Sequence, residues 1–151
     1  RRKKKEKRRK IDLATDAIYF EEGYLTPTQI NLIFKHLPID ITYVDENDKV
    51  IFYNNGDDRI FPRSPGIIGR EVKFCHPPKS VDNVLKILEE FKQGSKDNAE
   101  FWINFKDSFI HIRFFAIRDK NKNYKGVMEI TQNVSDIKAL EGERRILDWQ
   151  S

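Results

Sequence analysis

The chain has 151 residues, of which 38% are hydrophobic and 34% are charged, and its formal net charge is +4. This length suffices for one domain with a single core and extensions. No apolar run of bilayer length occurs, no apolar core follows the basic start, and a single cysteine cannot form an internal disulfide. We therefore expect a cytoplasmic protein that does not bind membranes.

The charge is concentrated in residues 1–10, RRKKKEKRRK, which carry a local net charge of +8. Subtracting it from the total of +4 leaves −4 for residues 11–151. Such a block is typical of a solvated linker or tail. A nucleic-acid arm is the alternative, but the acidic remainder offers no second basic patch, so we do not expect nucleic acid as a partner. Because the chain begins with Arg, we expect a fragment from the C-terminal part of a longer protein.

An N-terminal extension, residues 11–37, contains a clear helix signal in LTPTQINLIFKHLP. Thr26 can cap the helix, Pro27 occupies a tolerated first position, and Gln29 can complete a capping box. Apolar residues then recur at helical spacing, at Ile30, Ile33, Phe34 and Leu37. These signals predict a flanking helix.

Residues 38–134 carry the pattern of a single α+β domain. IDITYVDENDKVIFYNN predicts two short strands around an Asp/Asn-rich reversal at residues 45–49. After a loop region, Ser80 can cap a second helix, whose apolar positions include Val84 and Leu88 and which Gly94 ends. The segments AEFWINF, SFIHIRFFAIRD and YKGVMEITQ then predict three more strands.

The middle one of these three strands has two different faces. One face is wholly apolar and should point to the core; it holds Ile110, Ile112, Phe114 and Ala116. The other mixes His111 and Arg113 with aromatic and aliphatic residues. Residues 135–151 predict a C-terminal helix with Ser135 as its cap, too short for a coiled coil. The order of elements predicts an α+β fold with a five-stranded antiparallel sheet, connecting helices on one face, and flanking helices at both ends.

Three short motifs on this order resemble a PAS domain across roughly residues 28–138. IDITYVDENDKVIFYNN is similar to the PAS opening, with Asp45 and Asn54 at its characteristic polar positions. IIGREVKFCHPPKSV resembles the segment before the long connecting helix, in which His76 and Pro77 match a His-Pro pair. ITQNVSDIK resembles the closing strand loosely, with Asn133 where the family commonly has Asp.

A narrower resemblance is carried by LPIDITYVDENDKV, IFPRSP and CHPPKSV. Together they resemble the C-terminal PAS module of prokaryotic proteins with a hemerythrin-like helical domain upstream. The resemblance implies a sensory or interaction module, which holds a small ligand between sheet and connecting helix and acts on a flanking helix or dimer partner. Fold alone does not fix the ligand.

The residues argue against the common cofactors of this family. The family's haem sensors generally take a histidine from within the connecting helix, and residues 81–93 contain none. The light-sensing branch needs an Asn-Cys-Arg-Phe-Leu segment, whereas the cysteine here stands in KFCHPP. A structural zinc site needs three or four convergent ligands, which the scattered histidines and single cysteine do not supply. We therefore expect neither haem nor flavin nor a metal, and leave the cofactor unknown.

Four residues remain as candidate ligand-binding residues. Cys75 and His76 precede the second helix, where its dipole and nearby lysines could lower the thiol pKa; a small buried cysteine is the alternative. His111 and Arg113 could hold an anionic ligand, or could be satisfied by cross-strand or interface partners.

We expect no enzyme, because phosphate-binding, hydrolase and metalloprotease signatures are absent from the sequence. The leading hypothesis is a regulatory module that binds a small molecule or redox signal and relays it through flanking helices or a homodimer. The alternative is a ligand-free docking domain for an upstream domain or a second copy, in which the abundant Phe side chains fill the core.

Overall fold

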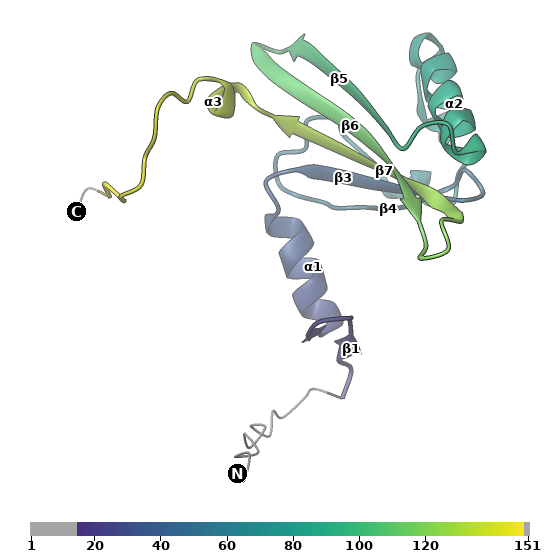
Figure 1. Ribbon diagram of the computed structural model, residues 1–151, viewed down its shortest axis with the longest axis horizontal. Coiled ribbons are helices and arrows are strands. Elements are labelled where there is room, and N and C mark those ends of the chain that lie inside the picture. Colours follow the sequence, from purple (N-terminus) through teal and green to yellow (C-terminus); the bar gives the residue numbers. More distant parts are fainter. Residues whose placement is uncertain (1–14, 150–151) are drawn as a thin grey trace, which may run out of the picture.

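The fold is a twisted five-stranded antiparallel sheet with one long helix against one face (Figure 1). The computed structural model describes residues 15–149, apart from the side chains of Phe74 and Cys75. The sheet order is β4-β3-β7-β6-β5. Its strands are β3 (Asp40–Asp45), β4 (Val50–Tyr53), β5 (Asn98–Phe105), β6 (Ser108–Arg118) and β7 (Tyr124–Asn133). This confirms the predicted α+β architecture.

Strand β6 shows how the sheet divides into two faces. We call the face under α2 (Pro78–Gln93) the inner face and the opposite one the outer face. Ile110 is 2% exposed, and Phe114 and Ala116 pack against the buried core, so the apolar side of β6 faces inward as predicted. Because side chains alternate along a strand, His111 and Arg113 lie on the outer face.

Helix α2 covers the inner face through three buried residues, Val84, Leu88 and Phe91. It ends at Gly94, whose φ of 78° is the left-handed conformation that suits a helix C-terminus. The prediction that Ser80 caps this helix is wrong. The N-cap residue is Pro77, and Ser80 lies inside the first turn, where its hydroxyl donates to the Pro77 carbonyl at 3.2 Å. Two short 3-10 helices, η1 (Pro65–Ile67) and η2 (Val72–Cys75), precede α2.

Helix α1 (Pro27–His36) has the predicted capping box, in which Gln29 N–H donates to Thr26 Oγ1 and Thr26 N–H to Gln29 Oε1. The helix projects away from the sheet and buries none of its residues (Figure 1). A ring contact between Phe34 and Phe52, 4.9 Å between centroids, joins it to β4. A small hairpin of β1 (Ile18–Tyr19) and β2 (Tyr24–Leu25) precedes α1 and was not predicted.

The C-terminal helix is much shorter than predicted. Helix α3 covers only Ser135–Lys138, and residues 139–149 form no helix. Gly142 has a φ of 64°, and Leu140 and Trp149 are 75% and 83% exposed. A helix of this length is marginal in water unless its apolar side packs on something, and no such packing occurs here. Within residues 15–149, no helix is long and apolar enough to cross a membrane.

Candidate ligand-binding site

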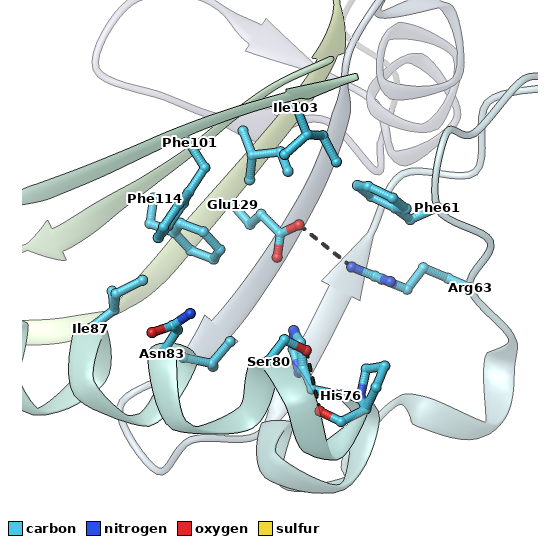
Figure 2. A pocket seen from close by; sticks show the side chains of 13 residues that line it. Phe61, Arg63, His76, Ser80, Asn83, Ile87, Phe101, Ile103, Phe114 and Glu129 are labelled. Atoms are coloured by element: carbon cyan, nitrogen blue, oxygen red, sulfur yellow. Dashed lines mark hydrogen bonds and ion pairs between the residues drawn. The ribbon is translucent and has the colours of Figure 1, made fainter. Parts of the chain in front are cut away.

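A cavity of about 410 Å³ lies between the inner face of the sheet and α2 (Figure 2). Its walls come from three parts of the chain: the loop after β4, the first turns of α2, and the inner face of β5, β6 and β7. Most of the lining is apolar, with side chains from Phe61, Val84, Ile87, Phe101, Ile103, Ile112 and Phe114. The polar lining comes from Arg63, His76, Ser80, Asn83 and Glu129.

The aromatic rings stand in the walls of this cavity and do not fill it. Phe101 and Phe114 meet edge to face at 6.1 Å, and Phe61 packs against Phe105 at 5.4 Å. Phe101 and Ile103 on the edge strand β5 are each 39% exposed, so the cavity opens at this edge. The abundance of Phe therefore does not produce the closed core that the docking hypothesis assumed.

An ion pair between Arg63 and Glu129 spans the polar part of the cavity (Figure 2). Arg63 Nη2 and Glu129 Oε1 are 3.6 Å apart, and the two side chains are only 18% and 14% exposed. Glu129 occupies an inward position of β7, opposite Thr42 of β3 and Phe114 of β6. Its Oε1 also accepts a bond from the Thr131 hydroxyl at 3.3 Å. A charged pair thus sits in an otherwise apolar wall.

A second arginine connects this region to α1. Arg59 Nη1 donates to the carbonyl and side-chain oxygens of Asn54, at 2.6 and 3.2 Å, and its Nε donates to the Phe61 carbonyl at 3.2 Å. Burial lowers the pKa of Arg59, and the nearby carboxylate of Asp40 opposes that effect. The field of Arg63 and Glu129 also reaches Arg59.

The four predicted site residues are not brought together. His76 lines the cavity, and its Nδ1 is 2.9 Å from the Val72 carbonyl. His111 and Arg113 lie on the outer face, separated from the cavity by the sheet. The side chain of Cys75 lies outside the described residues, so the reactivity of its thiol stays a prediction, as does the role of residues 1–10.

The two outer-face residues have different surroundings. His111 Nε2 is 2.7 Å from Glu100 Oε2 on the neighbouring strand β5, which is the cross-strand partner that the sequence allowed for. Arg113 lies over the ring of Phe115, 5.5 Å from its centroid, and its Nε is buried without a hydrogen-bond partner within the described part of the chain. Ordinary sheet contacts therefore account for His111 more fully than for Arg113.

Sequence reasoning missed Arg63 and Glu129. A signal for Glu129 was present. It shares one face of its strand with Val127 and Thr131, and a charged residue is unexpected on a face whose positions should be apolar or small. No comparable signal marks Arg63, which lies in a loop. Among the side chains that the structure describes, which do not include that of Cys75, no three His, Cys, Asp or Glu residues are grouped so that they could hold a metal ion.

Comparisons with known proteins agree with this architecture. A family described as PAS domain matches residues 30–135. The C-terminal domain of a protein from Streptococcus mutans has 34% sequence identity and a TM-score of 0.77, over 83% of this chain and 97% of that one. No curated protein matches the sequence.

Two further solved structures share the fold at low identity. The PAS domain of a protein from Colwellia psychrerythraea has 19% identity and a TM-score of 0.52, over 72% of this chain and 97% of that one. A sensory box sensor histidine kinase from Vibrio cholerae has 10% identity and a TM-score of 0.52, over 70% of this chain and 89% of that one. At these identities the similarity shows the fold alone.

Proposed function

Because this chain belongs to the PAS-domain family, we propose that it is a regulatory module that binds a small molecule in the cavity between the sheet and α2. Binding would alter the position of its flanking segments, and so the activity of a larger protein. The similarity to a C-terminal domain from Streptococcus mutans supports a role at the end of a longer chain. The proposal includes a hemerythrin-like domain upstream, on the ground of the sequence resemblance carried by IFPRSP and CHPPKSV.

The observation that carries this proposal is the cavity itself. Ligand sites are usually concave, mostly apolar, and 300–1,000 Å³ in size, with a few polar groups that fix orientation. The cavity of about 410 Å³ meets each of these criteria, with Arg63 and Glu129 as its charged groups. Burying two charges costs free energy, and apolar residues would serve at least as well in a wall that had only a packing role.

A series of electrostatic interactions and hydrogen bonds connects the cavity to α1. Arg63 and Glu129 act electrostatically on Arg59, and Arg59 donates two hydrogen bonds to Asn54. Asn54 in turn donates to the carbonyl of Phe34 in α1. A ligand that repositions Arg63 would change the field at Arg59, and we propose that this contact series carries the change to α1.

A variant that fills the cavity tests the proposal. Ile112 lines the cavity from β6, so Ile112→Phe should occupy the ligand's space, whereas Ile117→Phe adds the same ring to the outer face of the same strand. Organic extracts of the purified protein would be analysed by mass spectrometry, and a library of aromatic fragments would be screened by thermal shift. We expect binding to the wild type and to Ile117→Phe but not to Ile112→Phe. Binding to none of the three proteins, or equally to all three, would contradict the proposal.

A second candidate function, docking to another copy or to the upstream domain, is favoured by exposed apolar residues. Trp102 on the outer face of β5 is 61% exposed, and Ile146, Leu147 and Trp149 near the C-terminus are 67–83% exposed. These could form a homodimer interface. Light scattering across a concentration series should then show a dimer that Trp102→Lys weakens, and a monomer at all concentrations would count against self-association.

A further inference from the structure

The charged pair in the cavity has hydrogen-bonding capacity left over. A direct charge-assisted N–H···O bond is about 2.7–2.9 Å long. At 3.6 Å, Arg63 Nη2 and Glu129 Oε1 attract each other as charges without forming such a bond. Within residues 15–149 the Arg63 guanidinium makes no other hydrogen bond, and the carboxylate has only the long contact from Thr131. Both groups border the cavity, so a ligand can reach them.

The pair specifies the polar edge of a ligand. A guanidinium can only donate hydrogen bonds and a carboxylate can only accept them. The matching ligand edge therefore carries an acceptor for Arg63 beside a donor for Glu129. A lactam or similar heterocyclic amide presents these two groups side by side, in one plane and with no net charge.

Charge balance argues for a neutral ligand. Arg63 and Glu129 neutralise each other, and a charged ligand would bring one of them next to a like charge in a poorly solvated site, which is costly. His76 Nδ1 donates to the Val72 carbonyl 2.9 Å away, so this nitrogen is already engaged within the protein and is not offered to a ligand.

The rest of the cavity favours a flat ring system. Phe61, Phe101 and Phe114 provide three aromatic surfaces, and aromatic groups pair well in stacked or edge-to-face geometry. Ile87 and Ile103 add aliphatic side chains to the same walls. The apolar walls and the single charged pair thus divide the cavity into a place for a ring body and a place for its polar edge.

From these observations we propose that the cavity recognises an uncharged, planar, bicyclic compound whose edge carries neighbouring donor and acceptor groups, with Glu129 accepting from the donor and Arg63 donating to the acceptor. This inference rests on the proposed ligand-binding function and specifies its ligand class. Glu129 and Arg63 are the residues that set specificity.

Three probe compounds of similar size test it: carbostyril, which is a bicyclic lactam, its O-methyl ether, which lacks the N–H donor, and the naphthoate anion. Affinities for the full chain would be measured by calorimetry or ligand-observed NMR. We expect carbostyril to bind about tenfold more tightly than either other compound, as one hydrogen bond to a charged group would give. Equal or tighter binding of the ether or of naphthoate would overturn the proposal.

The variant Glu129→Gln gives a second readout that a merely structural role would not produce. It removes the negative charge and leaves Arg63 uncompensated, so naphthoate should gain affinity while carbostyril loses it. An unchanged order of affinities in this variant would overturn the proposal, and if the variant fails to fold, the wild-type comparison decides alone. If none of the three probes binds, but fragments from the screen bind the wild type and not Ile112→Phe, then the proposed ligand class is wrong and the proposed binding function stands. If nothing binds, both are wrong.

Discussion

Asn54 Nδ2 donates a hydrogen bond to the carbonyl oxygen of Phe34 at 3.1 Å, which ties the end of β4 to helix α1. The same amide nitrogen donates to the Ile39 carbonyl at 2.8 Å, and Oδ1 accepts from the Ile41 N–H at 2.7 Å. Asn54 is only 2% exposed, so water cannot replace these partners. The residue therefore holds α1 in a fixed relation to β3 and β4.

The variant Asn54→Ala should destabilise the domain by about 3 kcal/mol, because it leaves several buried backbone groups without partners. The exposed neighbour Asn55 provides the control, and Asn55→Ala should change the free energy of unfolding by less than about 0.5 kcal/mol. Chemical denaturation of both variants measures the difference. Equal stabilities would show that Asn54 does not anchor α1.

Gly126 in β7 occupies a position that no other residue can take. Its φ is 131°, and a Cβ atom there would lie 2.1 Å from the Val44 carbonyl oxygen of the neighbouring strand β3. Gly126→Ala should therefore cost about 3 kcal/mol or more, by forcing β3 and β7 apart. Gly142→Ala provides the contrast. The φ of Gly142 is also positive, at 64°, but a Cβ atom there would have no neighbour within 4 Å. We therefore expect Gly142→Ala to cost less, because it introduces backbone strain without a steric clash. Similar thermal stabilities of the two variants would contradict the close approach.

Tyr124 should make stability sensitive to alkaline pH. Burial, with a contribution from Asp48, raises its pKa to about 12, against about 10 in an unfolded chain. The native state therefore keeps this proton between pH 10 and 12, where the unfolded state releases it, so native stability is unaffected below pH 10 and falls as the pH rises through this window.

Comparison with Tyr124→Phe isolates this effect from the other titrating groups. The stability of the wild type relative to the variant should decline between pH 10 and 12, and tyrosinate absorbance should lose its most alkaline transition in the variant. A constant difference between the two proteins across this range would contradict the raised pKa.

The predictable parts of the fold are those whose signals are local. The capping residues Thr26 and Gln29 and the alternation in β6 lie next to the residues they organise, and both predictions are confirmed. The β1–β2 hairpin was missed because strands of two residues are too short to show a period. The C-terminal helix was extended too far because spacing reports only that a helix could be amphipathic, while its formation depends on packing.

The site was harder to predict because it depends on contacts between distant segments. Arg63 lies in a loop and Glu129 in β7, and they meet only because that loop folds over the inner face. Conversely, His111 and Arg113 attracted attention as polar residues in a central strand, but alternation alone placed them on the face away from the expected ligand position. Because the expected ligand position is on the core side of the sheet, that assignment was already enough to separate them from the cavity.

Arg118 and Arg113 stand on opposite faces of β6, and their replacement should have opposite consequences. Arg118 Nη2 donates to the Phe91 carbonyl at 2.7 Å, near the end of α2, and its Nε pairs with Asp97 at 2.9 Å. Arg113 instead has a buried Nε with no hydrogen-bond partner among the described residues. Arg118→Met should cost about 2 kcal/mol, because it frees the C-terminal end of α2. Arg113→Met removes an unsatisfied donor and should leave stability unchanged or raise it.

Hydrogen exchange of the α2 amides checks the structural cause. Because α2 forms one wall of the cavity, Arg118→Met should speed exchange near Phe91 and raise the dissociation rate of any compound bound there. Arg113→Met should change neither quantity, since the sheet separates its side chain from the cavity. If both variants lose stability equally, or if α2 exchange is unaffected by Arg118→Met, then the contact with Phe91 does not hold the helix against the sheet.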